Sequence, residues 1–141
     1  EIAWQSATDL NSIGLILFHT ARSEDFFIQE LVRQQPQIWE ASGWTRHFNM
    51  TLEERGRHYK AEQVNAFVPP DIGDIRKYFT EVRAQTLEYI KTLKPEDYSR
   101  EITTPRGTNT VHGFLTNIIK HSAQHAGEIS YLRGLKRGLN Q

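Results

Sequence analysis

Two histidines four positions apart, His121 and His125, are the residues whose types and spacing indicate chemistry most directly. They continue the apolar positions of a helical pattern, and side chains at i and i+4 share one face of a helix, about 5–6 Å apart at Cβ. Two imidazoles placed in this way can bind one divalent metal ion. The alternative is a pair of hydrogen-bonded core residues, each of which would need partners for both ring nitrogens.

A third histidine would complete such a site, and His19 is the candidate. It directly follows the apolar run at residues 15–18, so it belongs to a separate, very apolar helix. Three neutral imidazoles leave at least one coordination position for water or substrate, as catalytic metal sites do. Because imidazole suits Zn²⁺, Ni²⁺, Fe²⁺ and Cu²⁺ alike, these ligands predict a divalent transition metal without selecting one.

Four other side chains are weighed beside this set. Glu128, three positions after the second histidine of the pair, is a candidate general base or a group that orients a ligand histidine. A surface glutamate is the plain alternative. His47 and His58 lie among charged residues in an irregular segment, which favours solvated surface. His112 lies more than two helical turns before the pair, too far to share its metal ion.

The composition excludes several classes of protein. The 141 residues suffice for one domain with a buried core, and we expect residues 1–141 to form a single helical domain. Seventeen basic residues balance seventeen acidic ones, which removes the electrostatic case for nucleic-acid binding. Cysteine is absent, so disulfides, thiol nucleophiles and Cys-based zinc sites are excluded. The longest apolar run is far too short to span a bilayer, so we expect no membrane partner.

The start of the sequence carries neither a basic region nor a long apolar one, so no signal peptide is visible and we expect a cytoplasmic protein. The chain opens on Glu1 rather than on methionine, from which we expect that upstream residues were removed or not included.

Apolar residues at helical spacing predict three long helices, over about residues 12–34, 71–93 and 111–135. The three helices begin at residues that can cap them, namely Asn11 or Ser12, Asp71 and Thr110. A proline follows the first helix and a Lys-Pro break follows the second. Residues 36–70 are less regular but rich in aromatic side chains. Residues 100–110 carry turn residues and four threonines. Strand signals are weak throughout, so the predicted class is all-α.

Several segments together resemble the DinB/YfiT-like superfamily of metal-dependent enzymes. Residues 11–25, which read NSIGLILFHTARSED, resemble the family's helix that carries its first histidine ligand. Residues 121–129, HSAQHAGEI, with 131–135 resemble its closing helix, which carries the other two. Residues 56–58 and 62–67 resemble one branch of the family. The resemblance thus covers most of the chain.

This resemblance implies a DinB-like up-down-down-up four-helix bundle in which His19, His121 and His125 hold Zn²⁺, Ni²⁺ or Fe²⁺ near one end. The family usually has a further helix before the segment that begins at residue 11. We therefore expect the domain to be N-terminally incomplete, with that helix upstream of Glu1 or another chain covering the exposed apolar face. A homodimer is expected on the same grounds.

From these observations we expect a metal-dependent enzyme that acts on a small molecule, as a thiol S-transferase or a hydrolase. The metal would lower the pKa of a bound thiol or water. Low-molecular-weight thiols are the candidate partners, as the resemblance implies. Two alternatives stay open: a non-catalytic metal-binding or stress-response module, and a plain helical interaction domain whose histidines are core residues.

Overall fold

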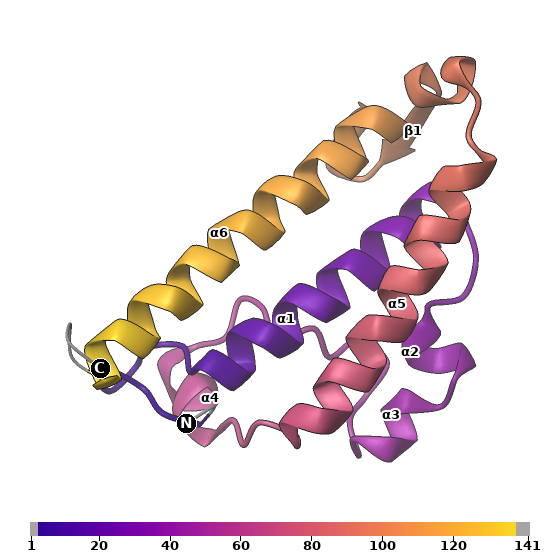
Figure 1. Cartoon of the computed structure of the whole chain (residues 1–141). Helices are drawn as coiled ribbons and strands as arrows, with labels where there is room; N and C mark the ends of the chain where they lie inside the picture. The colour runs from indigo at the N-terminus through magenta and orange to yellow at the C-terminus, as the bar shows by residue number, and fades with distance from the viewer. Residues whose placement is uncertain (1–2, 138–141) are drawn as a thin grey trace.

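Three long helices make up most of the computed structural model, which describes residues 3–137 (Figure 1). Helix α1 (Ile13–Asp25) continues without a break into a π-helix, η1 (Phe26–Val32), and the other two are α5 (Ile72–Thr92) and α6 (Val111–Arg137). Helix α1 lies between α5 and α6 and contacts both. In Figure 1, α1 and α5 run in the same direction and α6 runs the opposite way.

Shorter elements join the long helices. Between α1 and α5 the chain forms three short helices, and between α5 and α6 it forms a 3-10 helix and a small antiparallel sheet. Their bounds are α2 (Ile38–Ala41), α3 (Trp44–His47), α4 (Ala61–Ala66), η2 (Pro95–Ser99), β1 (Glu101–Thr104) and β2 (Gly107–Thr110).

Short polar side chains start the long helices as the sequence predicts. The Ser12 hydroxyl accepts a hydrogen bond from the Leu15 backbone N–H, and the Asp71 carboxylate accepts one from Gly73 N–H. Thr110 Oγ1 accepts from Gly113 N–H at the start of α6. Each cap satisfies a backbone donor that has no partner within the first helical turn, so each fixes the residue at which its helix begins.

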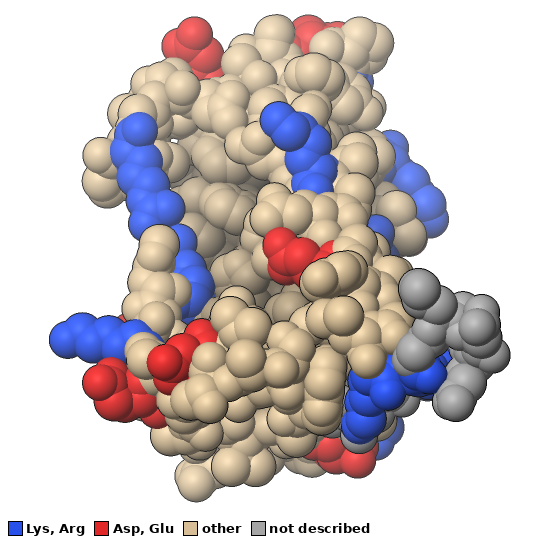
Figure 2. Space-filling model, turned by 90° about the vertical axis from the view of Figure 1, so that its left-hand side faces the viewer, with Lys and Arg blue, Asp and Glu red and all other residues tan. Residues whose placement is uncertain are grey.

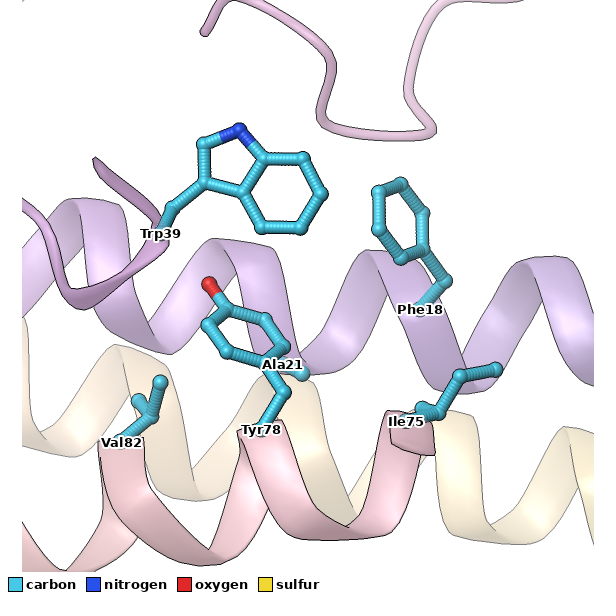
Figure 3. Close-up of a cluster of buried hydrophobic side chains, with 6 residues drawn as sticks. All are labelled: Phe18, Ala21, Trp39, Ile75, Tyr78 and Val82. Atoms are coloured by element: carbon cyan, nitrogen blue, oxygen red, sulfur yellow. The ribbon is translucent and has the colours of Figure 1, made fainter. Parts of the chain in front are cut away.

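One buried cluster joins α1, α5 and the aromatic segment between them (Figure 3). Phe18 of α1 and Tyr78 of α5 both lie against Trp39 of α2, with ring centroids 5.6 and 5.5 Å apart. All three side chains are fully buried. The aromatic residues of the irregular segment therefore form part of the core, as their apolar mass predicts, and they hold α1 and α5 together.

The π-helix η1 changes which residues of the first long helix face the core. Periodicity places Phe27 and Leu31 on the apolar stripe, yet Ile28 and Val32 are the buried residues, and both predicted residues are only partly buried. A π-helix bonds i to i+5 and so holds more residues per turn than an α-helix, which rotates the register. The apolar pattern alone does not reveal such a change.

The class prediction of all-α is wrong in one segment, since β1 and β2 pair as an antiparallel hairpin in which Glu101 faces Thr110. Threonine is β-branched and favours extended backbone, and the turn before Gly107 (φ +118°) closes the hairpin. Strands of four residues are too short for their alternation to stand out in the sequence. The molecule is thus mostly helical with one small sheet.

Three further observations concern the outside of the molecule. Leu135, which continues the apolar spacing of α6, is 51% exposed because the last turns of that helix extend past α1. Within residues 3–137, no helix combines the length and apolar character needed to cross a membrane. One face of the molecule is hollowed along its middle, with several Lys and Arg side chains at the rim (Figure 2).

Candidate metal centre

Three histidine side chains from two helices converge at one point. His19 of α1 and His121 and His125 of α6 each direct Nε2 toward the other two: Nε2 of His121 lies 3.1 Å from Nε2 of His19 and 3.1 Å from Nε2 of His125. One ligand atom from each residue lies within 4.8 Å of the others. The structure therefore brings together the three histidines that the sequence singles out.

Apolar contacts on both sides of the histidines hold α6 against α1. On α6 the pair lies between Ile118 and Leu132, and both of these are buried against α1 or its π-helical continuation η1. On α1, His19 follows Ile16, which packs with Leu132. Because each helix is fixed before and after the site, the relative position of the three imidazoles is set by helix packing rather than by loops.

A backbone carbonyl orients His19. Its Nδ1 lies 2.9 Å from the carbonyl oxygen of Arg55, which can only accept a hydrogen bond, so Nδ1 carries the proton and Nε2 keeps its lone pair. Gly56, the next residue, has a left-handed φ of +60°, and its Cα faces Leu15 and Phe18 of α1 closely. That close approach brings the Arg55 carbonyl within reach of the imidazole.

A carboxylate orients His125 in the same way. Glu128 Oε2 lies 2.6 Å from Nδ1 of His125, while Gln124 donates to the other carboxylate oxygen over 2.9 Å. Nδ1 of His125 therefore donates, and its Nε2 faces the cluster with a free lone pair. Metal-binding histidines commonly donate their second N–H to a carbonyl or a carboxylate, and this site has one of each.

The surroundings keep the imidazoles of His19 and His121 neutral. Burial, together with His125 and His19, lowers the pKa of His121 to about 4. Burial also lowers the pKa of His19, against the opposing effect of the Arg55 carbonyl. Burial raises the pKa of Glu128, but hydrogen bonds from Gln124 and His125 outweigh it and lower the pKa overall. At neutral pH, His19 and His121 are thus uncharged and Glu128 is ionised, and metal ligation requires neutral imidazoles.

These residues fit a divalent transition metal. Imidazole nitrogens bind Zn²⁺ at about 2.0–2.1 Å, and two nitrogens 3.1 Å apart can both lie at that distance from one ion. Hydrogen bonds among the three imidazoles would satisfy the cluster poorly. In His19 and His125 the proton is on Nδ1, so their Nε2 atoms can only accept, and His121 alone is left to donate. The donor set does not choose among the metals that imidazole binds.

A cavity of about 400 Å³ opens beside the three histidines. Its wall includes Ser23 of α1, whose hydroxyl lies 3.4 Å from Nε2 of His19, and the loop residues Arg57, His58 and Tyr59. Burial and a hydrogen bond to the Glu54 side chain raise the pKa of Tyr59, so its phenol stays protonated. The sequence gives no periodic signal for this loop; only the glycine at position 56 indicates a close backbone approach.

The remaining histidines lie apart from the cluster. His47 Nε2 lies 2.9 Å from an Asp74 carboxylate oxygen at the surface, and His112 is exposed in the first turn of α6. His58 is exposed, as its charged surroundings predict, yet it also lines the cavity. Its left-handed φ of +56° is uncommon for a residue other than glycine, so the loop is held in an unusual conformation beside the site.

Comparison with known proteins bears on the family and the fold of the chain. The family model of the DinB superfamily matches residues 1–129. The crystal structure of a conserved protein from Enterococcus faecalis is similar to this chain with a TM-score of 0.80 and 23% sequence identity. The match covers 95% of this chain and 80% of that one, and it concerns the fold. No curated protein matches the chain.

Proposed function

The chain belongs to the DinB superfamily, and on this premise we propose that it is a metal-dependent enzyme acting on a small molecule. The convergence of three Nε2 atoms is the observation that carries the proposal. His19, His121 and His125 would hold Zn²⁺, Ni²⁺ or Fe²⁺. Transfer of a low-molecular-weight thiol onto an electrophilic compound is the activity we favour, and hydrolysis is the close variant.

A divalent metal at this point would lower the pKa of a bound thiol or water, and so supply a nucleophile near neutral pH. The chain's own residues hold and orient the ligands. The Arg55 carbonyl and the Glu128 carboxylate fix the protonated nitrogens of His19 and His125. With both oxygens already hydrogen-bonded, Glu128 is better placed to position its histidine than to take a proton from substrate; a general-base role stays a prediction.

The neighbouring cavity supports catalysis over a purely structural metal. Structural zinc sites are closed by four protein ligands, whereas catalytic ones keep a position open. Within residues 3–137 the cluster offers three histidines as ligands, and a cavity of about 400 Å³ adjoins them. A non-catalytic metal-binding module is the alternative that this open side disfavours.

Two parts of the family plan stay predictions. Helices α1 and α5 run in the same direction and α6 runs the opposite way, as the second, third and fourth helices of an up-down-down-up bundle would. The first helix of that plan is not among the described residues. Association into a homodimer is likewise a proposal drawn from the resemblance.

Metal analysis of protein purified without a nickel column tests the proposal. Wild type should hold about one equivalent of a transition metal, and His121→Ala should hold none. His112→Ala, which removes an exposed histidine from the same helix, is the matched control and should keep the metal. Absence of metal in wild type, even after incubation with Zn²⁺, Ni²⁺ and Fe²⁺, would overturn the metal site.

Activity is tested on the loaded protein with a chlorinated bimane as model electrophile and a panel of low-molecular-weight thiols. We expect product to form with wild type and not with the metal-stripped chain. Thiol consumption at the same rate with and without metal would contradict the transferase, and the same comparison with model esters and amides tests the hydrolase.

A further inference from the structure

A second cavity, of about 450 Å³, lies next to the candidate metal centre and has an apolar floor. Phe26, Phe27 and Leu31 of the π-helix η1 and Phe114 of α6 contribute to this floor. The β-hairpin closes the cavity on one side, through residues 104–109. Small-molecule sites are typically concave, mostly apolar and about 300–1,000 Å³ in volume, with a few polar groups that orient the ligand.

The polar groups of this cavity are dominated by positive charge. Arg55, Arg57 and Arg106 line it, and none of its lining side chains, all of which lie within residues 3–137, is acidic. Burial, followed by the charge of Arg57, lowers the pKa of Arg55, and burial with Arg106 lowers that of Arg57. The arginines therefore repel one another, and Glu30, which is not among the residues that line the cavity, offsets this only in part at Arg55.

One guanidinium nitrogen lacks a partner. Nη1 of Arg55 is buried and has no hydrogen-bond partner among the described residues, while the guanidinium carbon lies 4.0 Å from the centre of the Phe26 ring. A buried donor without an acceptor is unfavourable, and a negative charge held among the arginines would stabilise this guanidinium. Stacking on Phe26 holds the guanidinium in place for such a ligand.

The two cavities are neighbours. Phe27 and Arg57 line both the arginine-lined cavity and the cavity beside His19, His121 and His125. A molecule bound among the arginines would therefore lie next to the cavity of the histidines. Figure 2 shows a hollowed face with Lys and Arg side chains along part of its rim.

We propose that the cavity lined by Arg55, Arg57 and Arg106 binds the anionic end of the substrate, a carboxylate or phosphate carried on an apolar body. The phenylalanines would contact that body, and guanidinium groups would pair with the anion through charge-assisted hydrogen bonds. The cavity would direct the other end of the molecule to the three histidines, and this last point rests on the proposed function. The hairpin, which supplies Arg106 from its turn, thereby gains a role in substrate binding.

Calorimetric titration with four small probes tests the proposal: 2-naphthyl phosphate, 2-naphthoate, neutral 2-naphthol and inorganic phosphate. Because an anion could also ligate a metal, the titrations use the metal-stripped His121→Ala variant beside wild type. The naphthyl anions should bind both proteins, and naphthol and inorganic phosphate should bind at least about tenfold more weakly. Comparing the two naphthyl anions shows whether the cavity prefers phosphate or carboxylate. Binding should weaken as salt is raised.

The double variant Arg57→Gln/Arg106→Gln should lose at least about tenfold in affinity for the naphthyl anions. Arg76→Gln, which removes one exposed charge from α5 at a separate surface, is the matched control and should bind as wild type does. Circular dichroism confirms that each variant is folded. Unchanged binding in the double variant, equal binding of naphthol, or binding lost in His121→Ala would each overturn the proposal.

These results separate the two proposals. If wild type holds metal but no naphthyl anion binds through the arginines, the inference about the cavity fails and the metal-dependent function stands. If the anions bind through the arginines but no metal is ever retained, the proposed function fails, and with it the claim that the cavity serves a metal centre.

Discussion

Nδ1 of His125 and Oε2 of Glu128 lie 2.6 Å apart, one helical turn from each other on α6. Because the carboxylate can only accept when it is ionised, the imidazole proton resides on Nδ1 and the Nε2 lone pair is directed at His19 and His121. A single side chain near the surface thus decides which nitrogen of this histidine is available to a metal ion.

Replacing Glu128 by Gln should weaken metal binding by about tenfold or more, because a neutral amide accepts the His125 proton less strongly. Competition with a chelator measures the affinity, and turnover at saturating metal is measured in parallel. The positioning role predicts a large change in affinity and a small change in turnover number. Near-complete loss of turnover with unchanged affinity would instead identify Glu128 as a general base. Glu62→Gln, at an exposed position of α4, serves as control.

The stability of the metal-free protein should fall as the pH is lowered from about 6.5 toward 4. The pKa of His121 is about 4 in the folded chain and about 6.5 in an unfolded one, so between these values the unfolded chain binds a proton that the folded chain does not. The contribution of His121 to the free energy of unfolding is complete above about pH 6.5 and declines as the pH falls toward about 4. Since the side chain is only partly buried, we expect about 1–2 kcal/mol rather than the full linkage value.

Urea denaturation of metal-free wild type and His121→Gln at several pH values measures this effect. Glutamine does not titrate, so the variant should lose less stability across the window, with the lowered pKa of His19 accounting for part of what remains. Parallel pH profiles for the two proteins would contradict the assignment to His121.

Gly56→Ala should damage both stability and the metal site, whereas Gly43→Ala should affect stability alone. Both glycines have left-handed φ values, +60° and +74°, which cost an L-residue about 1–2 kcal/mol. A Cβ at position 56 would also lie 3.1 Å from side-chain carbons of Leu15 and Phe18, and one at position 43 would meet nothing within 4 Å. The displaced loop would move the Arg55 carbonyl away from His19.

Thermal denaturation and chelator competition on the two glycine variants separate backbone strain from the close contact. Both variants carry the backbone strain of a left-handed φ. A loss of metal affinity that occurs only in Gly56→Ala therefore results from the close contact with Leu15 and Phe18. Equal metal affinity in both would show that the loop does not orient His19.

Asp25→Ala should destabilise the fold by about 3–5 kcal/mol, because it leaves the fully buried guanidinium of Arg22 without its ion-pair partner. The Asp25 carboxylate also accepts from Tyr78 and from two backbone N–H groups at the start of α2. Chemical denaturation measures the loss. Glu88→Ala, which breaks the exposed pair with Lys91, should change stability by less than about 0.5 kcal/mol. A small effect at Asp25 would indicate that water replaces the carboxylate.

The parts of the fold that depend on local rules could be predicted from the sequence. Ser12, Asp71 and Thr110 mark helix starts because a cap is a contact between residues three or fewer positions apart. The register change at Phe26 and the hairpin at Glu101 could not, since neither produces a distinct period over so few residues.

The candidate site divides in the same way. His121 and His125 are neighbours on any helix, so their spacing predicts their proximity, and the apolar neighbourhood of His19 predicts its burial. The loop that supplies the Arg55 carbonyl and Tyr59 is placed by tertiary contacts of Gly56, and no sequence period encodes such contacts. The ligand set was therefore accessible from the sequence, and the cavity around it was not.

The three histidines converge in space although His19 and His121 are 102 positions apart along the chain. A ribosome delivers the first long before the second, and the nascent chain therefore holds only one member of the cluster until its last long helix has been synthesised. An ion that joins the two would bind the folded chain and not the unfolded one, so it would stabilise the docked arrangement of α1 and α6. Bound metal would then mark finished, correctly docked copies of the chain, and C-terminally truncated copies would be recognisable by its absence.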